Sequence, residues 1–458
     1  MVQTHRIGQY NNKYQRQFAS EEALAASFKV LDSIKNKTDG ADKACKRIVT
    51  RKGAVEEEVT KRGQKCTRLD EQVAKSRKSV AIARAKCDAH ELTKEMQEKE
   101  VTQLEDDGPW QVARHADVHT ILRDHETYSS QVSIRPPEER GAPSMLFSDP
   151  PIHNRLRKLV SVAFKPGQIQ LQEQQIRSRC EALLDAMPID TELDLVQALA
   201  APLPVMVIAE MLGVEDGDMA TFKSWSDEIF SNIGEILFGT PSPESERAAE
   251  EMNTYFLQRI NEIRQRPKAH LLGQLVATET EDGKLDDEEL LSFCRLLLIA
   301  GNETTTGLIT ASARIFHEEP QTLKQLKQDP QLAGNFVEEA LRFYSPFSAT
   351  VRRTTKDVEI AGQAIAAGEL VVPLLASANR DERVFDAPDT FKLDRNPNPH
   401  LGLGFGIHVC LGAHLARLEG RVVVEQMAER YQSVELLNAK GATIGELGGP
   451  KSLSVRVR

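Results

Sequence analysis

Gly404-Phe405-Gly406-Ile407-His408-Val409-Cys410-Leu411-Gly412 is a glycine-rich stretch with one cysteine, and a helical pattern follows it from Ala413 to Arg430. A thiolate directly before a helix is stabilised by the helix dipole and by free N–H groups. Glycines also let the backbone approach a flat or bulky group. A lone cysteine in such a loop is more often a small buried hydrophobe, but this nine-residue context favours an axial thiolate ligand to haem iron.

A second stretch, Ala300-Gly301-Asn302-Glu303-Thr304, lies in the middle of an apolar pattern that begins near Asp286. The acidic residues at the start suit the positive end of a helix dipole. An acid and a hydroxyl in an otherwise apolar helix are costly unless they are used. Ala300 and Gly301 leave room for a small ligand. Alternatively, Thr304 bonds back to the carbonyl one turn earlier and bends the helix, and both interpretations can hold together.

Two further patterns are weak when each is taken alone. Glu339-Ala340-Leu341-Arg342 places an acid and a base three residues apart on a helix, a spacing that usually gives only a surface ion pair. In His153-Asn154-Arg155-Leu156-Arg157, His153 and Arg157 share one helical face and could grip a carboxylate together. Such pairs are more often solvated.

The rest of the chain predicts a mainly α fold with a small β portion. Strand-like alternation occurs at residues 110–114 and 350–375. Helical patterns cover the remainder, at 117–124, 154–163, 168–187, 201–212, 216–237, 245–266 and from Asp286 onward. A loop at 129–151 is long enough to be functional, and we expect it to act as a lid.

Charge and proline content divide the chain in two. All 21 prolines lie at position 109 or later, and residues 1–100 carry a net charge of +7 against −17 for the rest. We therefore expect a charged helical extension at 1–107 and a second unit at 108–458. Cys45, Cys66 and Cys87 are spaced by three heptads, but the apolar pattern between them is too weak to require a coiled coil. The extension could also be a non-native start.

The composition excludes several classes of protein. The net charge of −10 argues against a nucleic-acid partner for the main body. No apolar run is long enough for a membrane span, and no signal segment is evident at the N-terminus. Six cysteines without a C-x-x-C pair fit a reducing compartment. These features predict a cytoplasmic protein.

Taken together and in this order, the four motifs resemble those of soluble bacterial cytochromes P450 over about residues 109–458. Residues 378–381 and 397–401 match as well, whereas residues 1–107 remain unrecognised. The resemblance implies the cytochrome P450 fold, a haem b cofactor (iron protoporphyrin IX) and hydroxylation by a haem-thiolate monooxygenase. Among the family's members, the chain looks most like the bacterial group that acts on fatty acids, terpenoids and steroids.

The resemblance also implies a role for particular residues. Cys410 is the axial ligand of the iron, and Glu303 and Thr304 form the acid–alcohol pair that delivers protons during oxygen activation. Glu339 and Arg342 form a structural pair that braces the loop before the cysteine. The haem contacts are completed by Ala300 and by four residues that bind the two propionates: His153, Arg157, Arg352 and His408. The residues expected to line the substrate pocket are Leu296, Leu297, Ala300, Thr304, Phe347, Ser348, Val351 and Leu447.

This sequence departs from the family pattern in two places. Leu403 stands where the family usually has an aromatic residue, seven positions before the cysteine, which puts the redox potential in question. The family's N-terminal helix and outer strands have no recognisable counterpart in 1–107. We therefore expect a gap in the β portion and an exposed strand edge.

Three functions remain open at this point. The leading one is a monooxygenase that oxidises a lipophilic small molecule with electrons from a ferredoxin and a ferredoxin reductase, since the chain shows no flavin or dinucleotide motif. A peroxide-driven peroxygenase is the second, although such relatives tend to lack the acid–alcohol pair. A non-catalytic or inactive haem-binding fusion protein is the third.

Overall fold

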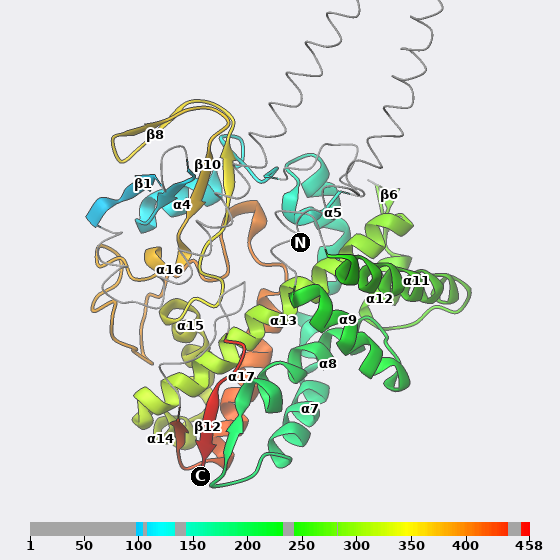
Figure 1. The fold of residues 1–458 in the computed structure, drawn as a ribbon, viewed down its shortest axis with the longest axis vertical. Helices are drawn as coiled ribbons and strands as arrows, with labels where there is room; N and C mark the ends of the chain where they lie inside the picture. The colour runs from blue at the N-terminus through cyan, green and yellow to red at the C-terminus, as the bar shows by residue number, and fades with distance from the viewer. Residues whose placement is uncertain (1–97, 104–107, 133–142, 232–241, 282, 438–449) are drawn as a thin grey trace, which may run out of the picture. The chain divides into compact units, whose positions relative to one another are not determined.

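The computed structural model describes residues 98–103, 108–132, 143–231, 242–281, 283–437 and 450–458. Within these ranges the chain is mainly helical with small sheets, which confirms the expected fold class (Figure 1). The three cysteines of the N-terminal heptads, the middle of the expected lid loop and Leu447 lie outside the described residues.

The helices follow the predicted patterns with small shifts at their ends. The expected helix at 168–187 is two helices, because the helical structure is interrupted near Leu171 between α6 and α7. Pro202 and Pro204 lie in the first turn of α8, where a missing N–H removes no hydrogen bond. The helices are α4 (His115–Arg123), α5 (Ile152–Ser161), α6 (Pro166–Gln170), α7 (Glu173–Asp185), α8 (Pro202–Met211), α9 (Met219–Ser231), α11 (Pro243–Gln265), α12 (Leu271–Ala277), α13 (Asp287–Glu318), α14 (Pro320–Gln328), α15 (Ala333–Phe343), α16 (Leu375–Ala378) and α17 (Ala413–Arg430).

The 32-residue helix α13 begins where the acidic cluster predicted. The Asp286 carboxylate accepts a hydrogen bond from the Glu289 backbone N–H at 2.8 Å, and the Glu289 carboxylate accepts one from the Asp286 N–H at 3.1 Å. This reciprocal capping box satisfies two N–H groups that have no partner inside the helix. The sequence therefore fixes the start of the helix that passes through the core.

The largest sheet has five strands in the order β1-β2-β10-β7-β3. Strand β2 runs parallel to β10, and the other neighbours are antiparallel. A second sheet has the order β11-β12-β4, and β5-β6 and β8-β9 form two hairpins. The strands are β1 (Val101–Gln103), β2 (Trp110–Val112), β3 (Tyr128–Ser129), β4 (Glu192–Asp194), β5 (Glu279–Thr280), β6 (Gly283–Lys284), β7 (Arg352–Thr354), β8 (Val358–Ile360), β9 (Gln363–Ile365), β10 (Leu370–Pro373), β11 (Val434–Leu436) and β12 (Ser454–Val457).

Strand β1 corrects the expectation of a missing neighbour beside β2. Val101 pairs with Val112 and Gln103 with Trp110 in an antiparallel register. Just before the strand, the Glu100 carboxylate forms an ion pair with Arg114 at 2.7 Å. The end of the segment expected to be a separate extension thus covers the edge of β2. Its three residues gave too short a pattern to be recognised in the sequence.

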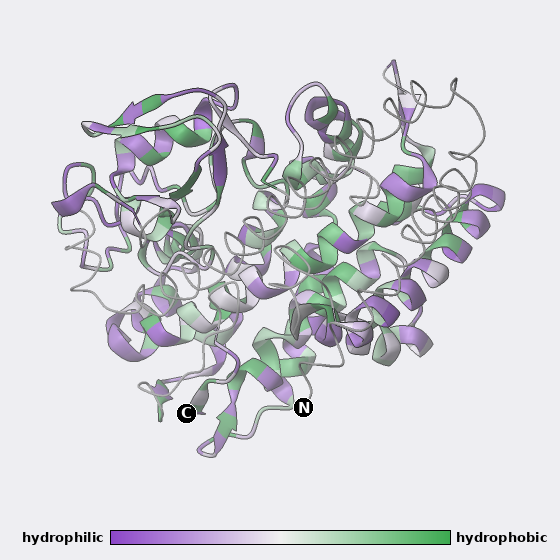
Figure 2. Cartoon of the chain, turned by 45° about the horizontal axis from the view of Figure 1, so that its top comes forward, coloured by the Kyte–Doolittle hydropathy of each residue, from purple (hydrophilic) through white to green (hydrophobic). Residues whose placement is uncertain are grey.

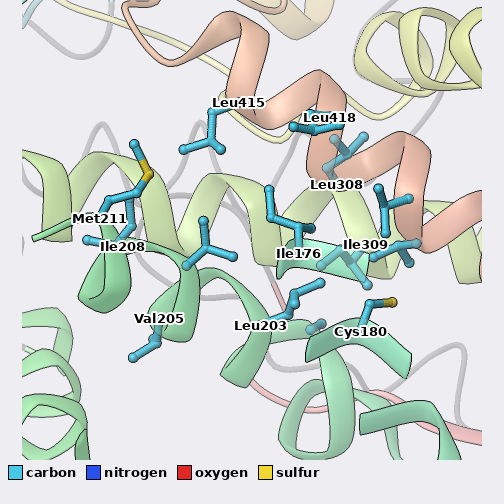
Figure 3. Close-up of a cluster of buried hydrophobic side chains, with 14 of the residues drawn as sticks. Ile176, Cys180, Leu203, Val205, Ile208, Met211, Leu308, Ile309, Leu415 and Leu418 are labelled. Carbon is cyan, nitrogen blue, oxygen red and sulfur yellow. The ribbon is translucent and has the colours of Figure 1, made fainter. Parts of the chain in front are cut away.

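The main hydrophobic core lies between α7, α8, α13 and α17 (Figure 3). Hydrophobic positions are frequent on the helices in the centre of the view, and hydrophilic positions are frequent on the outer helices (Figure 2). Each fully buried leucine or isoleucine stabilises the fold by about 1.5–3 kcal/mol. The side chains that meet here include Ile176, Leu203, Ile208, Leu308, Ile309, Leu415 and Leu418. This packing fixes α13 against α17, the helix that follows Cys410.

No helix within the described ranges is both long enough and apolar enough to cross a membrane.

Candidate functional site

Cys410 lies at the end of a loop that folds back on itself just before α17. Its backbone N–H donates to the Leu403 carbonyl at 2.8 Å, which closes the loop. Gly404 and Gly406 have φ angles of +71° and +72°, in the left-handed region that favours glycine. The glycines therefore give the loop its shape, and the sequence correctly placed the cysteine directly before a helix.

Helix α4 supports the loop from one side. A Cβ atom at Gly406 would overlap the Leu122 carbonyl, so this glycine is required for close contact between the two backbones. The neighbouring Phe405 ring packs on His119 of α4, with ring centroids 4.0 Å apart. At Gly406 the close approach is thus to protein backbone, a use of glycine that the sequence analysis did not anticipate.

The environment of Cys410 is more complex than a helix N-terminus alone. Its side chain is accessible, yet desolvation by the surrounding protein raises the pKa of the thiol. The Gly412 N–H and the positive charges of Arg157 and Arg417 oppose that rise. The surrounding chain therefore desolvates the sulfur although Cys410 is accessible.

The four residues expected to bind propionates come from three elements and lie near one another. His153 and Arg157 come from α5, Arg352 from β7 and His408 from the cysteine loop. The rings of His153 and His408 pack with their centroids 4.3 Å apart. Burial, and then the positive charges of Arg352, His153 and Arg157, lower the pKa of His408 to about 3. The sequence motifs therefore converge on one site that brings together two arginines and two imidazoles.

This site fits a group that carries carboxylates. Nε2 of His153 and Nε2 of His408 are buried without a hydrogen-bond partner among the described residues. Arg352 is only 7% exposed, and its guanidinium donates to the Thr350 hydroxyl and the Val351 carbonyl. Buried donors of this kind are costly unless an acceptor satisfies them. Two propionates would provide such acceptors, so these residues suit haem b.

In the middle of α13, the polar residues point in different directions. Ala300 is exposed, and the Thr304 hydroxyl donates to its carbonyl at 2.8 Å, which confirms the expected back-bond. Glu303 is partly exposed. Asn302 is buried and donates to the Ser226 hydroxyl at 3.0 Å. Gly301 faces α8, where a Cβ atom would come within 3.0 Å of Ile208. The absence of a side chain at Gly301 therefore serves helix packing, and Ala300 and Thr304 lie on the accessible side.

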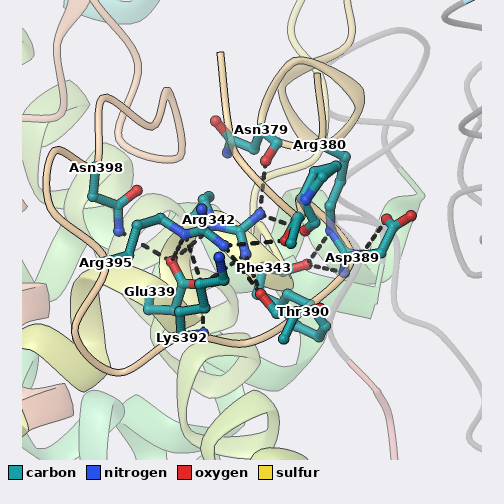
Figure 4. Close-up of polar contacts among 12 residues, drawn as sticks. Glu339, Arg342, Phe343, Asn379, Arg380, Asp389, Thr390, Lys392, Arg395 and Asn398 are labelled. Carbon is teal, nitrogen blue, oxygen red and sulfur yellow. Dashed lines mark hydrogen bonds and ion pairs between the residues drawn. The ribbon is translucent and has the colours of Figure 1, made fainter. Parts of the chain in front are cut away.

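Glu339 and Arg342 of α15 form a fully buried ion pair (Figure 4). The interpretation of the isolated motif as a surface ion pair is therefore wrong. Their side chains are 1% and 0% exposed, and the Arg342 guanidinium donates to both carboxylate oxygens at 2.7 and 2.8 Å. Arg342 also donates to the carbonyl of Asn379, and the Asn379 side chain accepts from the Leu401 N–H at 2.7 Å. The pair is thus connected to the segment that leads into the cysteine loop.

Arg395 is a member of this network that the sequence analysis missed. It donates to both Glu339 oxygens at 3.0 Å, so the carboxylate is shared by two guanidinium groups. The Lys392 N–H and the Asn398 side chain also donate to Glu339. The matching stretches at 378–381 and 397–401 pointed to this region without identifying Arg395.

A second ion-pair cluster holds the same segment from the adjacent position in α15. The Glu338 carboxylate accepts from Arg417 of α17 at 2.6 and 2.9 Å and contacts His400 at 3.1 Å. Burial alone would raise the pKa of Glu338, but these hydrogen bonds and charges lower it to about 2. Glu338 and Glu339 therefore fix the cysteine loop through two separate sets of contacts.

The residues expected to line a substrate pocket lie in several places. Leu296 borders a small cavity of about 10 Å³ between α5 and α13, lined also by Met145, Leu156 and Phe293. Leu297 is 8% exposed and packs in the main core. Phe347 and Val351 pack against the two smaller clusters near the five-stranded sheet, and the Ser348 carbonyl accepts from the Ala376 N–H.

Comparisons with known proteins agree with this arrangement. The family model described as Cytochrome P450 matches residues 111–440. A putative cytochrome P450, YjiB of Bacillus subtilis, is 36% identical over 366 residues, covering 77% of this chain and 89% of that protein. The vitamin D(3) 25-hydroxylase of Pseudonocardia autotrophica is 37% identical over 330 residues, covering 70% and 80%. The crystal structure of CYP109E1 from Bacillus megaterium in complex with testosterone is 36% identical, with a TM-score of 0.72 and coverage of 80% and 98%.

These relatives define the class of protein as a haem-dependent monooxygenase. Within that class, the chain belongs to the cytochrome P450 family. The family cofactor is haem b, and its members take electrons from redox partners.

Proposed function

We propose that this P450 inserts one oxygen atom of O2 into a lipophilic small molecule, with Cys410 as the axial ligand of haem b. The observation that carries the proposal is the placement of one accessible cysteine near two arginines and two histidines that lie close together. When bound, haem with an axial thiolate supplies the chemistry of oxygen activation.

Four side chains would hold the cofactor by its carboxylates. Arg157 and Arg352 would form charge-assisted hydrogen bonds, and His408 would donate from Nε2. Nδ1 of His153 donates to the Asn154 side-chain oxygen at 3.2 Å, so His153 would donate from Nε2 in its doubly protonated form. This set explains why two arginines and two imidazoles are retained in a site where burial opposes their positive charge. Ala300 lies on the accessible side of α13 and would leave space beside the cofactor.

Glu303 and Thr304 would transfer protons within the site. The Thr304 hydroxyl donates a hydrogen bond to the Ala300 carbonyl, so its oxygen lone pairs can accept a hydrogen bond from a second donor. If the hydroxyl turned and released its own proton to an acceptor, its oxygen would take up a proton from that second donor, and the hydroxyl would be restored. Glu303, the residue directly before Thr304, is partly exposed and would exchange protons with solvent.

We further propose a substrate of the fatty acid, terpenoid or steroid class and an electron supply through a ferredoxin and its reductase. The relatives named for vitamin D(3) and testosterone support the same class. A panel of steroids, terpenoids and fatty acids, scored by the low-to-high spin shift, tests this part.

The central assignment is tested by replacing the cysteine. Cys410→Ala should abolish the red-shifted Soret band of the reduced, carbon monoxide-bound protein, because the sulfur donor is lost. Cys294→Ala is the matched control, since Cys294 is a buried core residue whose thiol has a pKa raised to about 12 by burial. A normal band and normal turnover in Cys410→Ala would refute the assignment.

A further inference from the structure

Asp149 links two elements beside His153, Arg157, Arg352 and His408, the residues expected to bind the propionates. The proposed function assigns no role to Asp149. Its carboxylate accepts from the Ser129 hydroxyl at 2.5 Å and from the Ser130 backbone N–H at 2.9 Å. Its backbone carbonyl accepts from the His153 N–H at 3.0 Å, in the first turn of α5. Asp149 therefore binds the start of α5 to the end of β3, a segment 20 residues earlier in the chain.

Strand β3 continues this connection to β7. Tyr128 pairs with Thr354 and Ser129 pairs with Arg353. Arg352 is the first residue of β7. Asp149 thus joins the helix that carries His153 and Arg157 to the strand that carries Arg352.

The charge of Asp149 also acts on this cluster. Burial lowers the pKa of Arg352 to about 10, and the negative charge of Asp149 opposes that shift. Burial lowers the pKa of His153, Arg157 lowers it further, and Asp149 again opposes the change. A single carboxylate therefore favours the protonated form of groups on both elements.

We propose that Asp149 is a positioning residue for the cofactor site: it fixes the distance between α5 and β7 and supplies a negative charge to their cations. The inference rests on the proposed function, because it assumes that these cations hold the haem propionates. Residues that orient the direct contacts of a bound metal centre typically change its affinity about 10–100-fold when they are removed.

Three substitutions distinguish the effect of the hydrogen bonds between Asp149 and β3 from the effect of the negative charge of Asp149. Ser129→Ala removes one hydrogen bond of the connection and keeps the charge. Asp149→Asn removes the charge, but its amide oxygen can still accept from the Ser130 N–H. Asp149→Ala removes both. Asp194→Ala is the matched control, because the Asp194 carboxylate also joins distant segments by accepting from the N–H groups of Val196 and Leu453, but it lies in the other sheet.

The experiment measures the rate at which haem leaves the full-length ferric protein and passes to an excess of a haem-scavenging apoprotein. Asp149→Ala should accelerate this loss about 10–100-fold. Ser129→Ala should give a smaller acceleration, and Asp194→Ala none. The reduced carbon monoxide spectrum should keep its red-shifted band in all four variants, since Cys410 is intact.

The ferric–ferrous midpoint potential distinguishes the charge from a purely structural role. Reduction adds negative charge at the haem, so loss of a nearby carboxylate should make the potential of Asp149→Asn more positive. Ser129→Ala should leave the potential unchanged, because it keeps the carboxylate. If Asp149→Ala does not fold, Ser129→Ala and Asp149→Asn decide the question by their haem-loss rates and potentials.

The inference is overturned if Asp149→Ala loses haem no faster than Asp194→Ala, or if Ser129→Ala and Asp149→Asn both match the wild type in rate and potential. Failure of the proposed function gives a different result, namely a wild-type protein without the red-shifted carbon monoxide band.

Discussion

Glu419 of α17 is a buried carboxyl group that should make the stability of this protein depend on pH. Its side chain is 1% exposed, and Oε2 has no hydrogen-bond partner among the described residues. Burial raises its pKa from about 4.5 to about 8. The folded protein therefore keeps the proton at neutral pH, whereas the unfolded chain releases it.

The sign and size of the effect follow from this difference. Between the unfolded and folded pKa values the folded state binds more protons, so stability falls as the pH rises. Each pH unit in this window costs about 1.4 kcal/mol, and the full shift corresponds to an upper limit of about 5 kcal/mol. The stabilisation from protonated Glu419 is complete below about pH 4.5 and is lost as the pH rises through about 8.

Glu419→Gln keeps the shape of the side chain and cannot ionise. The variant and the wild type should unfold in urea with similar free energies near the acidic end of the window. Between about pH 5.5 and about pH 8.5, the difference should grow by about 3 kcal/mol in favour of the variant. Glu429→Gln, an exposed position of the same helix, is the control and should show no such growth. A difference between variant and wild type that is constant with pH would refute a raised pKa at Glu419.

Three other substitutions or truncations test further parts of the structure. Thr304→Ala should keep haem binding but release more peroxide per electron consumed, because a positioned proton donor is lost; unchanged coupling would favour a relay made of water alone. Glu339→Ala should lower the unfolding free energy by about 3–5 kcal/mol, since it leaves buried guanidinium groups without their carboxylate, and a change below about 1 kcal/mol in urea unfolding would contradict this. Chains that start at Glu98 or at Glu105 should both bind haem, because the expected contacts begin at His153, but only the first keeps β1. The chain from Glu105 should therefore bind substrate more weakly in a spin-shift titration, and equal affinities would show that β1 does not support the pocket.

Much of the fold could be predicted because its signals are local. The start of α13 depended on Asp286 and three acidic residues that follow it directly, and the structure confirms it. The strand at β2 and the strands between 350 and 375 were visible as alternation. Strand β1 was missed because three residues cannot show a period, and its stability depends on the pairing with β2.

The candidate site likewise has residues that the sequence could identify and contacts that it could not. The sequence alone identified the residues whose chemistry is unusual for their local context, such as Cys410 in its glycine loop and Thr304 in an apolar helix. Only the tertiary structure showed that Glu339 is shared by Arg342 and Arg395 and that Asp149 joins Ser129 to α5. The Arg395 contact spans 56 residues. Local periodicity carries no information about partners so far apart, because their contact is set by how helices and strands pack and not by spacing along the chain.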